Sequence, residues 1–150
     1  MIERTAGGSI GITTNVVVRV WDLEWNLISE HRSHNTWTTG GLNVLRNWLS
    51  GNFSARHITH IAWVDTGGTE RARDLVTQRV ITTDKVLLIR QFLPSASSAN
   101  GYTLNTIKAY NASIGGVEFA SDVFDAVGIS KTSSTQITVE WTHTFADGGI

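Results

Sequence analysis

The chain is 150 residues long, carries a formal net charge of −1 and contains no cysteine. This length suits one domain with one core, and the near-zero charge argues against nucleic acid or an acidic membrane surface as a partner. The lack of cysteine excludes disulfides, thiolate nucleophiles and sulfur-ligated metals. Charged residues make up only 17%, below the roughly 25% of an average soluble protein, so other residue types must cover the surface. Thr, Ser, Asn and Gly do so, and they favour strands and turns.

We expect one domain over residues 1–150, with loose ends. Residues 1–12 contain several glycines and few side chains to bury, which predicts a flexible N-terminal arm. Residues 146–150 are expected to form a short C-terminal tail. The chain has no run of 18 apolar residues and no apolar leader at its start, so we expect no membrane-spanning or signal segment.

Alternating polar and apolar residues predict most of the strands. The last of them, residues 136–145, should turn one apolar face to a core. The apolar run at residues 86–89 predicts a segment buried on both faces. Strands are expected at residues 15–22, 27–31, 58–64, 79–82, 85–93, 102–110, 117–120, 123–129 and 136–145.

One helix is predicted at about residues 39–50. Thr38 or Thr39 can cap its first amides, and Gly51 can supply the left-handed stop. A helix this short and one-sided is expected to lie across a sheet. Its apolar face should consist of Leu42, Leu45, Trp48 and Leu49.

Together these elements predict a mainly β fold. Many short strands separated by turns are typical of a β-sandwich or a jelly-roll-like barrel, here with the one short helix packed on it. The charged residues 70–78 are expected to form a helical turn or an irregular crossing.

Two patterns that could indicate catalysis lack the structural context that catalysis needs. Gly7 to Gly11 matches G-x-S-x-G, but that motif needs a strand before Ser9 and a helix after it, and neither is predicted. The acidic residues are scattered among turns, which indicates solvated carboxylates. We therefore expect no catalytic residue and no cofactor.

The histidines include two H-x-x-H pairs, which would suit zinc if each pair shared a face. Residues three apart in a strand point to opposite faces. We therefore expect ordinary surface or interface histidines and no metal site. The pairs are His31 with His34 and His57 with His60, and His143 is the fifth histidine.

Six tryptophans are more than a domain of this size needs. Trp48 and Trp141 lie on predicted core faces and are interpreted as packing residues. The other four lie near turns or on outer faces of strands, where a subunit interface, edge packing or stacking on a carbohydrate are the alternatives. These four candidate interface residues are Trp21, Trp25, Trp37 and Trp63.

Several segments, in their order along the chain, resemble a known family. Glycines 40 and 41 let the backbone enter a helix closely, and glycines 115 and 116 permit a tight reversal. Residues 131–134 then lead into the alternating last strand. The matching segments are residues 34–42, 58–62, 66–69, 99–103, 115–120, 131–134 and 137–145.

This order is similar to that of bacteriophage tail and tail-collar fibre proteins and their small stand-alone relatives. The chain departs from them at residues 63–65, where a Gly-x-Gly is common, and at Ala109 and Asn111, where Glu and Gly are common. The resemblance implies a non-enzymatic, oligomeric virion protein, with a trimer as one expected state, whose partners are other virion proteins.

No shaft repeat occurs in these residues, so the resemblance implies an adaptor, collar or baseplate part. A capsid decoration protein that binds the phage head is the alternative. A carbohydrate-binding or receptor-binding β module, suggested by the tryptophans, is a second alternative.

Overall fold

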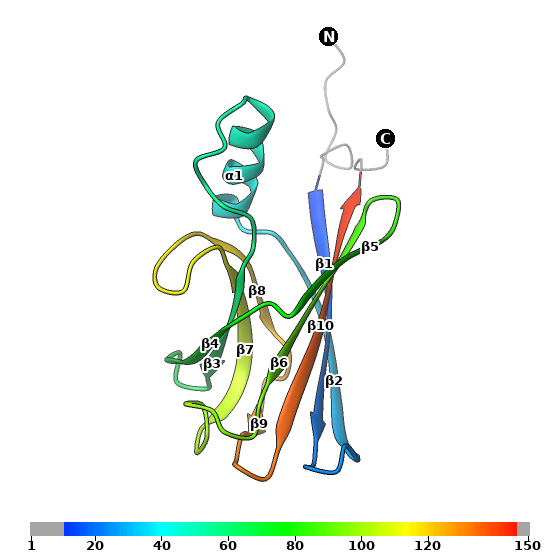
Figure 1. Ribbon diagram of the computed structural model, residues 1–150, viewed down its shortest axis with the longest axis vertical. Helices are drawn as coiled ribbons and strands as arrows, with labels where there is room; N and C mark the ends of the chain where they lie inside the picture. The colour runs from blue at the N-terminus through cyan, green and yellow to red at the C-terminus, as the bar shows by residue number, and fades with distance from the viewer. Residues whose placement is uncertain (1–10, 147–150) are drawn as a thin grey trace.

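Two antiparallel sheets face each other in the computed structural model, which describes residues 11–146 (Figure 1). The first sheet has the strand order β2-β1-β10-β6-β5, and the second has the order β4-β3-β7-β8, with β9 paired to β7. Both sheets keep open edges, so the predicted mainly β sandwich is confirmed and the barrel alternative is not. The elements are β1 (Gly11–Trp21), β2 (Leu27–Thr36), α1 (Thr39–Leu49), β3 (His60–Asp65), β4 (Glu70–Leu75), β5 (Gln78–Thr83), β6 (Val86–Leu93), β7 (Thr103–Tyr110), β8 (Glu118–Val123), β9 (Ile129–Ser130) and β10 (Gln136–Ala146).

The predicted alternation of the first and last strands is confirmed. β1 and β10 pair along their whole length, from Gly11 opposite Ala146 to Trp21 opposite Gln136. Every second residue turns inward, because successive side chains of a strand point to opposite faces. The inward residues of these two strands that are almost fully buried are Ile12, Thr14, Val16, Val18, Val20, Ile137, Val139, Trp141 and His143.

The helix begins and ends where the sequence predicts. The Thr38 side chain accepts a hydrogen bond from the Gly41 amide at 3.0 Å, and Gly51 has a φ of 91°. The predicted apolar face is half right, because Leu45 and Trp48 pack against the core. Leu42 and Leu49 are exposed, and Gly41 and Val44 are buried in their place.

Gly41 determines which face of α1 is buried. A Cβ placed on it would lie 2.9 Å from both the Cα and the carbonyl oxygen of Phe119. Only glycine permits so close an approach to β8. As a result α1 is attached at one end of the sandwich, above β8, and does not lie across a sheet (Figure 1).

Three further predictions are corrected by the structure. Residues 70–75 form strand β4, in which Ala72 faces the core while its neighbours Arg71 and Arg73 lie on the outer face of the sheet. Residues 124–128 form a loop in place of the predicted strand, because the Asp125 carboxylate accepts the amides of Val127 and Gly128. In the run 86–89 only Ile89 is buried, since the outer face of the first sheet is partly open to solvent.

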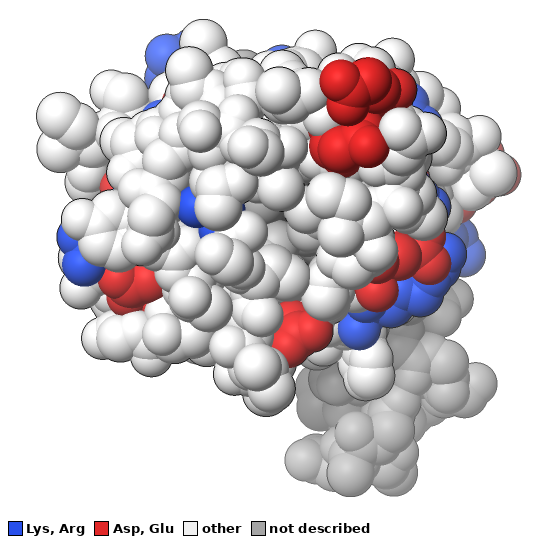
Figure 2. All heavy atoms as spheres, turned by 90° about the horizontal axis from the view of Figure 1, so that it is seen from below, with Lys and Arg blue, Asp and Glu red and all other residues white. Residues whose placement is uncertain are grey.

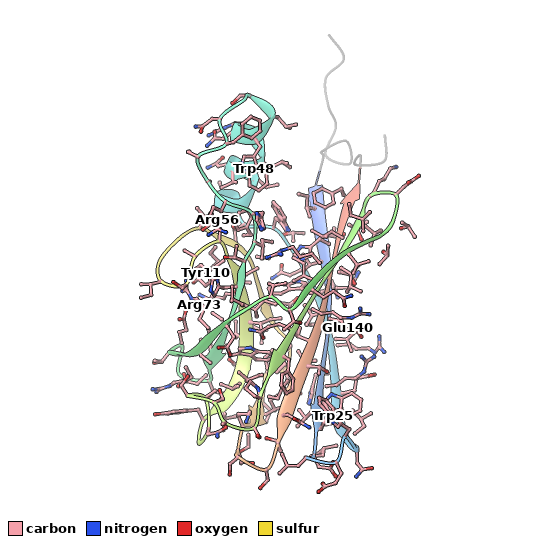
Figure 3. All side chains as sticks on the ribbon, in the orientation of Figure 1. Trp25, Trp48, Arg56, Arg73, Tyr110 and Glu140 are labelled. Atoms are coloured by element: carbon pink, nitrogen blue, oxygen red, sulfur yellow. The ribbon has the colours of Figure 1, made fainter. Side chains whose placement is uncertain are left out.

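The outer face of the second sheet is covered by its own long side chains (Figure 3). The Arg73 guanidinium lies 3.7 Å from the centre of the Tyr110 ring and donates to the carbonyl oxygens of Ala112 and Gly115. Ala62, paired with Arg73, is fully buried. Strand β3 is therefore covered on both faces.

Strands β1 and β10 extend further toward the ends of the chain than the sequence predicts. Gly11, Ile12 and Ala146 belong to β1 and β10, so the predicted arm and tail each lose residues to strands. The rest of both predicted segments, residues 1–10 and 147–150, lies outside the described residues. Over residues 11–146, no helix is long and apolar enough to cross a membrane.

Candidate functional site

An apolar recess opens between the two sheets beside α1. Its inner pocket has a volume of about 220 Å³. The walls come from α1, from both sheets and from the segment that precedes β3. The apolar side chains that form most of these walls are Trp37, Leu45, Trp48, Leu87, Phe119 and Phe145.

The aromatic walls of this pocket are fixed in place. The Trp37 ring meets the Phe119 ring edge to face, with centroids 5.3 Å apart, and its Nε1 donates to Nδ1 of His143 at 2.9 Å. The Trp48 Nε1 donates to the Ala55 carbonyl oxygen at 2.9 Å. Because the indole N–H groups are already bonded, the rings present apolar surface to the pocket without rearrangement.

A second hollow, of about 270 Å³, continues the first toward the β5–β6 hairpin. The two share Leu87 and Phe145 in their linings, and Ile81, 81% exposed, stands at the outer rim. The same end of the molecule exposes Leu49 and Phe53. We call the two hollows, with Ile81 as their outer rim, the α1 groove.

The charges at the α1 groove are few and positive. Arg79 lines the inner pocket and donates its Nε to the Ile58 carbonyl oxygen at 3.1 Å, and Lys85 lines the outer hollow. Burial, followed by the nearby charges of Arg79 and Arg56, lowers the pKa of His57, so this imidazole is neutral at pH 7. The groove is thus suited to apolar side chains, with two cations that could meet a carboxylate.

The four candidate interface tryptophans divide into two pairs. Trp63 is fully buried and its Nε1 donates to the Gln91 side chain, so the expectation that it lies on an outer face is wrong. Trp37 is also buried, but it forms a wall of the α1 groove. Trp21 and Trp25 lie together at the opposite end of the sandwich, where Trp25 is 52% exposed.

The histidines do not assemble a metal site in the part of the chain that the structure describes. His31 and His34 occupy β2 three residues apart and so point to opposite faces. No group of three or more potential metal ligands occurs between residues 11 and 146. His143 is buried in the core, where it accepts the Trp37 N–H, and its burial lowers its pKa to about 4.

One hydrogen-bonded chain has the atom order of a serine hydrolase triad. Nε2 of His31 lies 2.9 Å from Oγ of Ser29, and its Nδ1 lies 2.6 Å from Oδ2 of Asp125. Hydrolysis also needs N–H donors aimed at the developing oxyanion and a recess for the substrate. Ser29 lies within an edge strand and lines neither hollow of the α1 groove. These two hydrogen bonds of His31 therefore tie β2 to the loop after β8.

Sequence reasoning missed most of the α1 groove. Leu87 and Phe145 were expected on strands, and Ile81 was expected on a hairpin, but nothing local marks them as neighbours. They meet only because β6 pairs with both β5 and β10. The signal that could have been used was Ile81 itself, a large apolar residue beside a predicted turn.

Comparison of the chain with known proteins adds no assignment to these observations. No protein-family model, no curated protein and no solved structure matches it.

Proposed function

We propose that this chain is a non-enzymatic structural protein of the bacteriophage virion, an oligomeric assembly module of the tail or fibre-attachment apparatus. The observation that carries the proposal is the α1 groove, a preformed apolar recess on the surface of the domain. Exposed apolar recesses of this kind typically bind side chains of another protein. The ordered resemblance of residues 34–42, 99–103 and 137–145 to phage tail and tail-collar fibre proteins supplies the phage context.

The occupant we propose is a second copy of this chain, with its residues 1–10 as the inserting segment. β1 begins and β10 ends at the end of the sandwich that bears the α1 groove (Figure 1). Ten residues can span up to about 33 Å when extended, enough to reach a neighbour. The segment contains Met1, Ile2 and Ile10 as apolar anchors, and Glu3 could meet Arg79 or Lys85 at the rim.

Light scattering coupled to size-exclusion chromatography tests this docking. The full chain should form a homo-oligomer, with a trimer as the expected state. Ile81→Glu places a charge at the rim and should shift the protein to monomer, as should deletion of residues 1–10. Val127→Glu is the matched control, because Val127 is 83% exposed but belongs to the loop after β8. A full chain that stays monomeric at high concentration, or an oligomer that Ile81→Glu leaves intact, would contradict the proposal.

The position of the chain in phage particles tests the virion assignment. Cryo-electron microscopy of particles should place a few copies at the tail or at the site of fibre attachment. Copies spread over the whole head would support the alternative, a capsid decoration protein whose groove binds shell subunits. Absence from purified particles would sink both assignments.

A further inference from the structure

Three aromatic rings form a surface at the end of the sandwich opposite α1, where Figure 3 labels Trp25. They belong to Trp21, Trp25 and Phe92, which we call the Trp25 shelf. The centroid of the Trp25 ring lies 5.8 Å from that of Trp21 and 5.7 Å from that of Phe92. Since Trp25 is half exposed, the shelf offers an aromatic face to solvent and does not close a core.

The backbone holds Trp25 in a conformation that side chains rarely adopt. Its φ is 64°, in the left-handed region, which costs about 1–2 kcal/mol for a residue other than glycine. The Asp22 carboxylate fixes the turn by accepting the amides of Glu24 and Asn26 at 2.9 and 2.8 Å. The turn therefore holds the half-exposed Trp25 ring at a fixed position.

A cleft of about 270 Å³, partly apolar and with several polar and charged side chains in its lining, adjoins the Trp25 shelf. Phe92 lines the cleft and also belongs to the shelf, and Thr138, which lines the cleft too, accepts a hydrogen bond from Nε1 of Trp21 at 2.9 Å. Arg19, Arg90 and Glu140 line the cleft from three neighbouring strands of the first sheet, and Figure 3 labels Glu140 among them. An aromatic surface therefore lies beside a row of hydrogen-bonding groups.

The charges of the cleft are already paired. Glu140 accepts from Nη1 of Arg19 at 2.6 Å and from Nη2 of Arg90 at 3.0 Å. Arg19 also binds Glu30, and Arg90 also binds the Gln78 side chain. Paired guanidinium groups attract an additional anion weakly, yet each has five N–H groups, more than these bonds use. Seen from this end, the surface is mainly uncharged, with a few groups of acidic and basic side chains, some of them side by side (Figure 2).

We propose that the Trp25 shelf and the adjoining cleft bind a neutral pyranose sugar. The apolar C–H face of the ring stacks on Trp25, where the aromatic face carries partial negative charge. Sugar hydroxyls, which both donate and accept, bond to Arg19, Arg90, Glu140 and Thr138 in the cleft. This site goes beyond docking at the α1 groove and does not depend on it.

A glycan array, followed by saturation-transfer NMR with methyl α-D-glucopyranoside and methyl β-D-galactopyranoside, tests the site. The wild-type chain should bind neutral glycans and show transfer to at least one of the two methyl glycosides. Trp25→Gly is the decisive variant, because glycine adopts the same φ freely and so keeps the turn. It should lower affinity by at least about tenfold.

Phe53→Ala is the matched control, since it removes an exposed aromatic ring at the α1 end. It should leave glycan binding unchanged, and a melting curve should show both variants folded. A flat array, a preference for sulfated or sialylated glycans, or binding that survives Trp25→Gly would each overturn the proposal. None of these outcomes bears on oligomerisation, so the two proposals stand or fall separately.

Discussion

The two ends of the sandwich expose aromatic and apolar side chains in different ways. At the α1 end, Trp37 and Trp48 form the walls of a recess, with their N–H groups bonded inside the protein. At the other end, Trp25 projects from a turn and rests on Trp21 and Phe92. A recess encloses an inserted side chain, whereas a shelf contacts one face of a flat ligand. Under the two proposals, tryptophan contributes to binding a protein at one end and a sugar at the other.

The difference also concerns what holds each end in place. The α1 end depends on close packing between a helix and β8, through Gly41. The Trp25 end depends on hydrogen bonds within a turn, through Asp22. We therefore expect substitutions in the shared core to affect both ends, and substitutions at either end to act locally.

The largest effect should come from Trp63→Ala, which should destabilise both ends of the sandwich. Trp63 is fully buried between the sheets and donates to Gln91 at 2.8 Å. Its removal leaves a large cavity and an unpaired amide oxygen, so the free energy of unfolding should fall by about 3–5 kcal/mol. Urea unfolding followed by circular dichroism measures it. A loss below about 1 kcal/mol would show that the core is not shared as described.

Acid should weaken the α1 end through His143, which accepts the Trp37 indole proton. Burial lowers the pKa of His143 from 6.5 to about 4. Between these values the unfolded chain binds more protons than the folded one, so stability falls as the pH drops from 6.5 to 4. A tenfold change in proton affinity is about 1.4 kcal/mol, so the loss should approach about 3 kcal/mol.

His143→Gln provides the reference for this measurement, because it cannot take up the proton. Urea unfolding at pH 7 and at pH 4 should show a larger loss in the wild type than in the variant. Asp122, whose pKa is raised by burial, acts with the opposite sign in both proteins and cancels from the difference. Equal losses would contradict the predicted role of His143.

A smaller effect, confined to the α1 end, is expected from Gly41→Ala. The new Cβ would meet the backbone of Phe119, which cannot move cheaply, so we expect a loss of about 1–3 kcal/mol. Gly40→Ala is the matched control in the same turn, because its Cβ would find ordinary contacts at 3.4 Å or more. Unfolding curves that rank the two variants equally would contradict the account of helix packing.

The smallest effect is expected at Trp25, where strain and packing oppose each other. Trp25→Gly relieves the left-handed backbone but loses half-buried contacts, so stability should change by less than about 1 kcal/mol. Trp25→Ala keeps the strain and should be less stable than Trp25→Gly by about 1 kcal/mol. Thermal denaturation compares them. If alanine were the more stable, Trp25 would not be strained as described.

Local pattern predicted the framework of this fold well. The paired strands β1 and β10 alternate cleanly, and Thr38 and Gly51 mark both ends of α1. What failed depended on distant neighbours. The sequence shows Leu42 and Leu49 on one helical face, but the contact that orients the helix is made by Phe119, about 80 residues away.

The candidate sites were predicted less well, for a similar reason. Alternation alone cannot tell which face of β3 is covered, and Arg73 folds over one face while the core covers the other. The sequence therefore predicted an outer position for Trp63, which is in fact fully buried. Trp25 was correctly expected near a turn, because the residues around it are typical of turns, but the neighbouring Phe92 is far along the chain.

Amide hydrogen exchange of the full chain at low and high protein concentration tests most directly the claim that the α1 end docks a second copy. The account predicts that exchange in residues 39–58 and 78–87 slows as the concentration rises, while residues 21–27 at the Trp25 end exchange at unchanged rates. Exchange that is independent of concentration at the α1 end, or protection that appears at the Trp25 end in its place, would contradict it.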